Sequence, residues 1–277
     1  MFMNVVSIPE ATLSNGVQMP LLGLGTWKSK DGEEVISAVK YALETGYSHI
    51  DTASIYGNET GIGRAIKESG IPRELLFITS KVWNSDQGYY STLKAFELSI
   101  NKLETNYLDL YLIHWPVKDK YKETWKALEK LYEEGKVKAI GICNFHIHHL
   151  EDLLPGCNVI PMINQVEYHP LLNQKHLLAY CKLNRIQFEA WSPLMQGYLT
   201  LPVLEELSDK YRKTPAQIVL RWDIQNGVIT IPKSVKPARI IENAGIFDFE
   251  LSEEDMARLN NMNSNERFGP NPDTFTF

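Results

Sequence analysis

The chain has 277 residues, of which 44% are hydrophobic and 22% are charged, and its formal net charge is -6. This composition is typical of globular proteins with a full hydrophobic core, and the acidic balance argues against a nucleic-acid partner. No apolar run is long enough to span a bilayer, so no membrane partner is expected. Because barrels of this length often form one domain, we expect residues 1–277 to be a single domain.

The N-terminus and the cysteines predict a cytoplasmic protein. The first ten residues, MFMNVVSIPE, lack the basic region and the following apolar stretch of a secretory signal peptide. Cys143, Cys157 and Cys181 are odd in number and show no CxxC spacing. We therefore expect three free thiols in a reducing compartment.

The first predicted element is a β-hairpin. Residues 12–20 carry Asn15 and Gly16 between two short apolar stretches. Both residues accept the positive φ of a tight hairpin turn. We expect this hairpin to cover one end of the main fold.

Helices and short apolar segments alternate after the hairpin. Residues 33–45 have the apolar spacing of a helix, and Gly46 follows at the position that a helix C-terminal glycine takes. Thr214 and Pro215 predict an N-cap followed by a proline at the first helical position. The other helices are expected at 59–69, 90–103, 121–134, 148–154, 174–183 and 237–243.

Short apolar strands separate these helices and predict the fold class. The strands begin near positions 21, 47, 76, 108, 137, 162, 186 and 228. Eight such β/α units close most naturally into a (β/α)8 TIM barrel, here with an N-terminal β-hairpin and a short C-terminal tail. A doubly wound open sheet is the alternative. It normally carries GxGxxG after an early strand, whereas the run from Gly23 to Gly25 lacks the third glycine.

Four polar residues hold equivalent places at the ends of successive strands. Asp51, Lys81, His114 and Asn144 recur at the spacing of one β/α unit. Taken singly, each has an ordinary explanation, such as helix capping or solvation. In a barrel, however, the C-terminal strand ends share one rim, where barrel enzymes keep their chemistry. We expect the four side chains to meet there, with Tyr56 on the loop beside Asp51.

This set of residues suits proton transfer from a phenol. An ordinary Tyr has a pKa of about 10, and we expect the nearby ammonium of Lys81 to lower the pKa of Tyr56. Asp51 would hold Lys81 charged and in place, and His114 would add a neutral hydrogen-bond donor. A phenolic acid fits protonation of a carbonyl oxygen while a hydride reaches the carbon, and the hydride must come from a cofactor.

The signal for that cofactor lies near the C-terminus. Residues 231–243 read IPKSVKPARIIEN, a basic and polar loop followed by a helix that starts at Pro237. Barrels commonly bind phosphate here, at the free amides of a helix N-terminus. Lys233 and Arg239 add positive charge, although a solvated helix start is the plain structural alternative. Trp191, at the end of the seventh strand, could stack on a flat ring or simply pack at the rim.

These segments closely resemble the aldo-keto reductase family. The matching segments are GLGTW (23–27), GYSHIDTASIYGNE (46–59), ITSKVW (78–83), LDLYLIHWP (108–116), GICNF (141–145), NQVEYHP (164–170), AWSPL (190–194) and IPKSVKPARIIEN (231–243). They extend over nearly the whole chain in the family's order. The short tail resembles that of compact bacterial members that reduce glyoxal, methylglyoxal or 2,5-diketogluconate.

The resemblance implies an NADPH-dependent reductase of small aldehydes, dicarbonyls or keto sugars. It implies that Tyr56 is the general acid, that Lys81 and Asp51 support it, and that His114 orients the substrate carbonyl. Family members of this kind are often monomers. Trp27, Trp83 and His114 match positions that line the substrate pocket.

The resemblance also assigns residues to the cofactor, NADPH or NADP+. The matched positions are Gly25, Thr26 and Asp51 near the first loops, Asn144 and Gln165 at the nicotinamide carboxamide, Trp191 for stacking, Ser192 and Leu194 at the pyrophosphate, Lys233, Ser234 and Arg239 at the 2′-phosphate, and Glu242 and Asn243 at the adenine. One position departs from the family, since Cys143 stands where many members have Ser. We expect this thiol to weaken one hydrogen bond to the carboxamide.

Two other interpretations compete with a reductase. The family includes nicotinamide-binding regulatory and lens structural proteins, but we expect a binding protein of that kind to have lost one of Asp51, Tyr56, Lys81 and His114. The second alternative is a metal site formed by His146, His148 and His149. No carboxylate or thiol completes an obvious ligand set with them, so we expect no metal and a surface helix instead.

Overall fold

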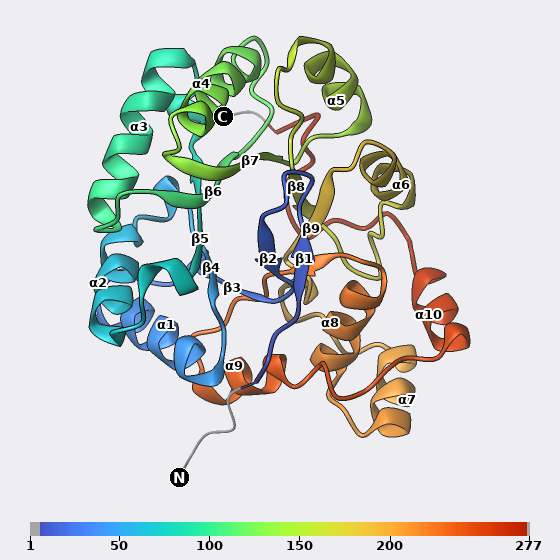
Figure 1. Cartoon of the computed structure of the whole chain (residues 1–277). Coiled ribbons are helices and arrows are strands. Elements are labelled where there is room, and N and C mark those ends of the chain that lie inside the picture. The colour runs from blue at the N-terminus through green and yellow to red at the C-terminus, as the bar shows by residue number, and fades with distance from the viewer. Residues whose placement is uncertain (1–5, 276–277) are drawn as a thin grey trace.

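The computed structural model describes residues 6–275 and forms the predicted barrel (Figure 1). Within these residues, eight parallel strands are hydrogen-bonded in chain order from β3 to β10. Isolated parallel bridges from Leu22 to Thr230 and from Gly25 to Lys233 join the last strand to the first and nearly close the barrel. The strands are β3 (Gly23–Gly25), β4 (His49–Asp51), β5 (Phe77–Val82), β6 (Leu108–Ile113), β7 (Val137–Cys143), β8 (Ile163–Glu167), β9 (Gln187–Trp191) and β10 (Ile229–Thr230).

Helices surround the barrel, and its strands are buried on both faces. Every residue of β5 and β6 is buried, because one face of each strand points into the barrel and the other packs under helices. This double burial explains the continuous apolar runs in the sequence. The helices that alternate with the strands are α1 (Glu33–Thr45), α2 (Glu59–Ser69), α3 (Tyr89–Lys102), α4 (Tyr121–Glu133), α5 (Ile147–Leu153), α6 (Lys175–Leu183), α8 (Pro215–Gln225) and α9 (Pro237–Ala244).

The helix predictions are confirmed to within one or two residues, but they missed two helices. These are α7 (Pro202–Tyr211), which precedes α8, and α10 (Glu253–Asn260), which follows α9. Both are accessory to the β/α repeat and bury only a few residues each, so their apolar pattern is weak. At α8 the predicted N-cap is confirmed, because the hydroxyl of Thr214 accepts a hydrogen bond from the amide of Gln217 at 3.3 Å.

The hairpin covers the end of the barrel at which the strands begin (Figure 1). Strands β1 (Glu10–Thr12) and β2 (Gln18–Pro20) are antiparallel, and Gly16 in the turn has φ 89°. Nδ2 of Asn15 donates a hydrogen bond of 2.9 Å to the carbonyl oxygen of Lys138, at the start of β7. The opposite end of the barrel, where the strands stop, is therefore left open for a site.

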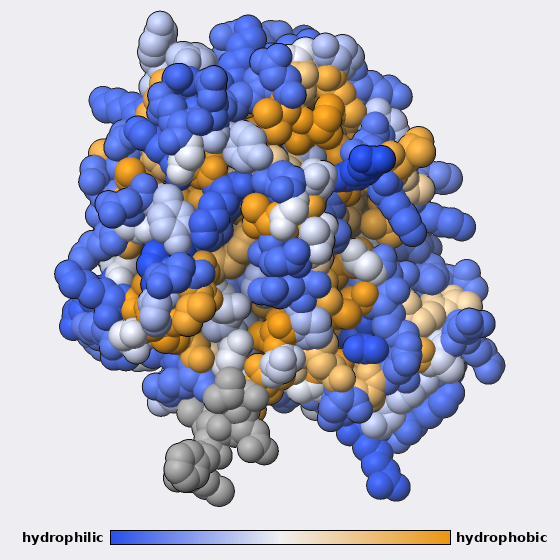
Figure 2. All heavy atoms as spheres, in the orientation of Figure 1, coloured by the Kyte–Doolittle hydropathy of each residue, from blue (hydrophilic) through white to orange (hydrophobic). Residues whose placement is uncertain are grey.

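The molecular surface is mixed in character. In the orientation of Figure 1, hydrophilic side chains predominate and hydrophobic patches are scattered between them (Figure 2). Within residues 6–275, none of the helices combines the length and the apolar character that a membrane span needs. Cys143, Cys157 and Cys181 are free thiols, as the sequence predicts.

We expect replacement of Gly46 by Ala to destabilise the fold. Gly46 ends α1 with φ 113°, and its amide donates to the carbonyl oxygens of Ala42 and Leu43. A Cβ in this left-handed conformation should lower the free energy of unfolding by about 1–2 kcal/mol, measurable by urea denaturation. Gly156→Ala is the matched control, because Gly156 has no left-handed φ and a Cβ there meets nothing within 4 Å. Equal stability of the two variants would contradict the prediction.

Candidate active site

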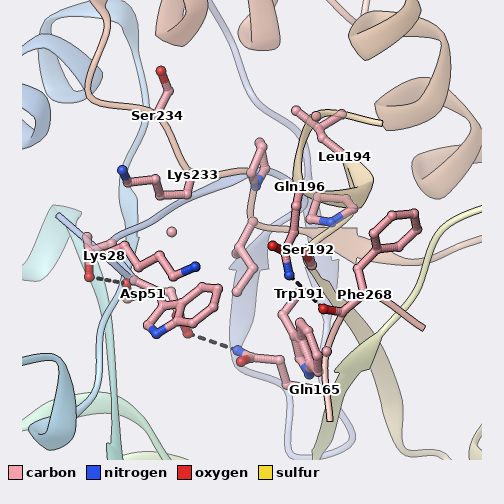
Figure 3. Close-up of a pocket in the computed structure, with 18 of the residues that line it drawn as sticks. Lys28, Asp51, Gln165, Trp191, Ser192, Leu194, Gln196, Lys233, Ser234 and Phe268 are labelled. Atoms are coloured by element: carbon pink, nitrogen blue, oxygen red, sulfur yellow. Dashed lines mark hydrogen bonds between the residues drawn. The ribbon is translucent and has the colours of Figure 1, made fainter. Parts of the chain in front are cut away.

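A cavity of about 1120 Å³ opens at the C-terminal ends of the barrel strands. It brings together every predicted site residue except Lys81, whose buried side chain lies directly behind the lining. The predicted residues that line the cavity are Gly25, Thr26, Trp27, Asp51, Tyr56, Trp83, His114, Asn144, Gln165, Trp191, Ser192, Leu194, Lys233, Ser234, Arg239, Glu242 and Asn243. Figure 3 shows several of them around the cavity.

Asp51 and Lys81 form a buried ion pair at the base of this cavity. The strand register pairs Asp51 with Thr79, and Lys81, two residues further along β5, points to the same side of the sheet. Nζ of Lys81 lies 2.6 Å from Oδ1 of Asp51 and donates a second bond of 2.9 Å to the carbonyl oxygen of Thr52. Burial is the largest single cause and lowers the pKa of Lys81, but the neighbouring groups, with Asp51 first among them, together outweigh burial and raise that pKa above its ordinary value. Lys81 is therefore a charged ammonium at neutral pH.

Tyr56 lies beside this ammonium, at the end of a 3-10 turn (Ser54–Tyr56) that follows β4. The turn is tied to β5 by a hydrogen bond of 3.1 Å from the hydroxyl of Ser54 to the carbonyl oxygen of Lys81. Nζ of Lys81 lies 5.2 Å from the centroid of the phenol ring. The predicted pairing of phenol and ammonium is thus present in the fold.

The prediction that the pKa of Tyr56 is lowered is wrong, because its pKa is raised overall. Desolvation of the hydroxyl is the largest cause, and it raises the pKa of Tyr56 to about 12. The charge of Lys81 acts in the expected direction and lowers the pKa, but it does not outweigh desolvation. The phenol is therefore fully protonated at neutral pH, in the form that can donate a proton.

His114 contributes a neutral imidazole to the same corner of the cavity. It directly follows β6, and its ring meets those of Tyr56 and Trp83 edge-on, with centroids 5.7 Å and 5.1 Å away. Burial and then the charge of Lys81 lower the pKa of His114 well below its ordinary value. Its Nδ1 is buried and has no hydrogen-bond partner within residues 6–275.

Gln165 connects the ion pair to β9, and Asn144 connects His114, after β6, to Trp191 at the end of β9. Nε2 of Gln165 donates to Oδ2 of Asp51 at 2.8 Å and to Oε2 of Glu189 at 2.9 Å. Asn144 adopts φ 66°, a left-handed conformation that Asn tolerates. Its Oδ1 accepts a hydrogen bond of 2.8 Å from the indole N–H of Trp191. The side-chain amides at this side of the cavity are therefore held in fixed orientations.

The sequence interpretation missed Glu189, which lies under this network. Burial and then the charge of Asp51 raise the pKa of Glu189 to about 8. Because most of the carboxyl is protonated at neutral pH, the site avoids a second buried negative charge beside Asp51. Nothing in the local sequence marks Glu189, since it sits in an ordinary apolar strand and meets Asp51 only through Gln165 across the barrel.

Cys143 is buried under the same side of the cavity. Its Sγ contacts Oε1 of Gln165 at 3.9 Å, and burial raises the pKa of the thiol well above its ordinary value. The side chain is thus a weak, uncharged hydrogen-bond donor that faces a neighbouring amide.

The other end of the cavity carries positive charge. Lys233 and Arg239 line it, and within residues 6–275 neither side chain has an ion-pair partner. Figure 3 shows Lys233 and Ser234 on this side, away from Trp191. The helix α9 begins at the same edge with Pro237 and has no side-chain cap on its first amides. Unpaired cations at an uncapped helix start suit a phosphate, so these residues fit the phosphate groups of a dinucleotide.

Thr214 and Glu242 join α8 to α9 at this end. The hydroxyl of Thr214 donates to Oε1 of Glu242 at 2.8 Å, and both residues line the cavity beside Asn243. Thr214 is a lining residue that the sequence interpretation used only as a helix cap.

Aromatic side chains that were not predicted also enclose the cavity. Trp115 and the tail residues Phe268 and Phe275 line it, and the rings of Trp115 and Phe275 lie 4.6 Å apart. Trp115 directly follows His114 in the segment LDLYLIHWP, so its position beside a predicted site residue could have indicated that it lines the cavity. The tail has no periodic pattern that would place Phe268 or Phe275 in the cavity.

Lys28 is a further lining residue that the sequence interpretation missed. It follows the segment GLGTW directly and adopts φ 61°. Its Nζ lies 4.2 Å from the centroid of the Trp27 ring, and Figure 3 shows the side chain within the cavity. Lys28 therefore adds a positive charge between the aromatic and the cationic parts of the lining.

The histidine cluster differs from its prediction. His146, His148 and His149 lie at the start of α5, as expected for a surface helix, but the tail places a carboxylate beside them. Asp273 comes within 2.9 Å of Nδ1 of His146 and 3.1 Å of Nε2 of His148. The sequence separation is too large for any spacing rule to show this contact.

Comparison with known proteins agrees with this fold and cavity. Residues 21–264 match the model of the Aldo/keto reductase family. The chain is 60% identical to a glyoxal reductase of Bacillus subtilis (strain 168), over 96% of each chain. It is 49% identical to the methylglyoxal reductase DkgA of Salmonella typhimurium, over 95% of this chain and 96% of that one.

A solved structure shows the same architecture. An aldo-keto reductase of the silkworm Bombyx mori, complexed with NADPH, superposes with a TM-score of 0.90 at 36% identity. The match covers 95% of this chain and 90% of that one. Given the barrel, the strand-end residues and these matches, the chain belongs to the aldo/keto reductase family.

Proposed function

We propose that the protein is an NADPH-dependent carbonyl reductase that converts small aldehydes and ketones to alcohols, with Tyr56 as the general acid. Glyoxal, methylglyoxal-type dicarbonyls and keto sugars are the proposed substrates. The observation that carries the proposal is the protonated phenol of Tyr56 in the cavity, next to the buried ammonium of Lys81. The similarity to a glyoxal reductase and a methylglyoxal reductase supports the substrate class.

The side chains have complementary roles in the proposed proton transfer. Tyr56 donates its proton to the carbonyl oxygen, and Lys81 stabilises the phenolate that remains. Asp51 keeps Lys81 charged and in position, and the neutral imidazole of His114 donates a hydrogen bond to the same oxygen. When it is bound, the reduced nicotinamide supplies the hydride to the carbonyl carbon. Tyr56 then regains a proton from solvent.

The lining of the cavity supports NADPH as the cofactor. Asn144, Gln165 and Trp191 form the end where the nicotinamide would bind, next to Tyr56. Lys233 and Arg239 form the end that suits a phosphate. The silkworm relative solved with NADPH supports the same assignment.

An enzyme is favoured over a binding protein of the same family. All four residues of the proton-transfer set are present, and their charge states suit catalysis: Lys81 charged, Tyr56 protonated and His114 neutral. We further propose that residues 1–277 act as one domain, as a monomer, in the cytoplasm.

Replacing Tyr56 by Phe should remove the proposed acid and leave the cavity in place. We expect the kcat for methylglyoxal to fall by about a hundredfold to ten-thousandfold, the range for loss of a general acid or base. The dissociation constant for NADPH, measured by fluorescence titration, should stay unchanged. Tyr90→Phe is the matched control, because Tyr90 is a highly exposed residue that does not line the cavity. Turnover of Tyr56→Phe at the wild-type rate would exclude Tyr56 as the acid.

The raised pKa of Tyr56 predicts a pH profile that differs from that of an ordinary phenol. A phenol with a pKa of about 12 keeps its proton throughout the range from pH 6 to pH 10. The value of kcat/KM reports ionisations of the free enzyme, and we expect it to show no loss from Tyr56 up to pH 10. Initial rates of NADPH oxidation measure the profile, with the fold checked by fluorescence at each pH. If kcat/KM fell to half below pH 9 because Tyr56 loses its proton, the raised pKa of Tyr56 would be contradicted.

Replacing Arg239 by Ala should discriminate between the two nicotinamide cofactors. Loss of one charge-assisted hydrogen bond to the 2′-phosphate should raise the KM for NADPH roughly tenfold or more. The KM for NADH should change little, because NADH lacks that phosphate. Lys236→Ala is the matched control, since Lys236 is an exposed cation of the same loop that does not line the cavity. Equal changes in both KM values would rule out the 2′-phosphate contact.

A further inference from the structure

Near its end, the C-terminal tail contacts three histidines of α5. The carboxylate of Asp273 lies 2.9 Å from Nδ1 of His146, 3.1 Å from Nε2 of His148 and 3.9 Å from Nε2 of His149. These histidines belong to the N-cap and first turn of α5, which begins at the C-terminal end of β7. One carboxylate thus joins the C-terminal segment to the rim that carries the catalytic cavity.

The neighbouring donors determine which nitrogen of two histidines carries the proton. Nη2 of Arg267 contacts Nε2 of His146 at 3.1 Å, and an arginine can only donate, so the proton of His146 lies on Nδ1. The backbone amide of His146 donates to Nδ1 of His149 at 3.1 Å, so the proton of His149 lies on Nε2. In both rings the N–H therefore faces Asp273.

This arrangement suits a carboxylate better than a metal ion. A metal needs an unprotonated ring nitrogen, whereas His146 and His149 direct protonated nitrogens at the shared position. If each proton moved to the other nitrogen of its ring, the ring N–H of His146 would face the N–H of Arg267. The ring N–H of His149 would then face the backbone N–H of His146, so both donor pairs would repel. The positive charge of Arg267 further favours an anion at this place.

The second anchor of the tail lies a few residues earlier. Oε1 of Glu167, a fully buried residue at the end of β8, accepts hydrogen bonds from the amides of Phe268 at 2.6 Å and Gly269 at 3.1 Å. Asp273 is the next anchor along the chain. The segment that the two anchors hold supplies Phe268, Gly269, Pro270 and Phe275 to the wall of the cavity.

We propose that His146, His148 and His149 form a carboxylate-binding site whose occupant is Asp273 of the same chain, and that this contact selects among carbonyl substrates by positioning the tail wall. Asp273 is then a positioning residue, because it acts through Phe268 and Phe275 and does not itself line the cavity. Substrates long enough to reach the tail wall depend on the contact, and the smallest dicarbonyls do not. The inference rests on the proposed carbonyl-reductase function.

The first test measures the tail directly, without catalysis. Hydrogen–deuterium exchange of the full chain should show faster exchange in the peptide that spans 268–275 in Asp273→Ala than in wild type. Asp273→Asn, which keeps one acceptor oxygen, should be intermediate. Glu266→Ala is the matched control, because Glu266 is the other carboxylate of the tail and its side chain has no hydrogen bond or ion pair within residues 6–275. Unchanged exchange in Asp273→Ala would overturn the proposed site.

The second test compares a short and a long substrate. For Asp273→Ala, the KM for 4-nitrobenzaldehyde should rise about fivefold to tenfold, while kcat and KM for methylglyoxal change less than about twofold. An equal change for both aldehydes, or no change for either, would overturn the specificity role. If the wild-type protein reduces neither aldehyde, the proposed function fails, and the exchange experiment still decides whether the histidines hold Asp273.

The third test asks whether the contact is pairwise and whether a metal uses it. Within residues 6–275, the ring of His148 takes no part in capping α5 or in the contact with Arg267. In a double-mutant cycle, His148→Ala should add little to the rise in KM that Asp273→Ala causes, because both remove the same contact. Fully additive effects would contradict a shared contact. Stoichiometric Zn²⁺ binding that is lost in Asp273→Ala, measured by calorimetry, would identify a metal site and overturn the carboxylate assignment.

Discussion

The active site depends on one buried ion pair, between Lys81 and Asp51. Taking two charges out of water is costly, and the pair is tolerated only when hydrogen bonds satisfy both partners. Here the carbonyl oxygen of Thr52 accepts from the ammonium, and the amide of Gln165 donates to the carboxylate. The parallel register of β4 and β5 provides this geometry, so the barrel itself holds the ammonium under the cavity floor.

The charge states of the surrounding groups follow from that pair. The positive charge of Lys81 helps to keep His114 neutral, and the negative charge of Asp51 helps to keep Glu189 protonated. The phenol of Tyr56 also stays protonated, because desolvation of its hydroxyl outweighs the attraction between its anion and Lys81. In this state Lys81 does not make Tyr56 a stronger acid than usual. Its larger contribution is expected when the phenolate forms, since a preorganised charge acts most strongly where charge develops.

The cavity divides into chemically different parts that come from distant segments. The unpaired cations come from the segment after β10 and from α9. The proton-transfer residues lie at the ends of β4, β5 and β6 and on the turn after β4, and the C-terminal tail closes the aromatic side. The tail has little secondary structure of its own, and two carboxylates hold it in place. Glu167 accepts hydrogen bonds from its backbone amides, and its own Asp273 contacts the histidines of α5. Such contacts can change the shape of the substrate wall without disturbing Lys81 and Asp51.

The sequence alone determined the barrel and the rim residues, because both follow from local sequence patterns. Apolar strands alternate with helices at the β/α period, and Asp51, Lys81, His114 and Asn144 occupy the same place in successive units. Only the tertiary structure revealed Glu189, Phe275 and the contact of Asp273 with His146, since these depend on packing across the barrel and on an aperiodic tail. The pKa of Tyr56 was also decided there. The equivalent strand-end positions indicated the charge of Lys81 beside Tyr56, but desolvation, the larger cause, exists only once the chain has folded around the phenol.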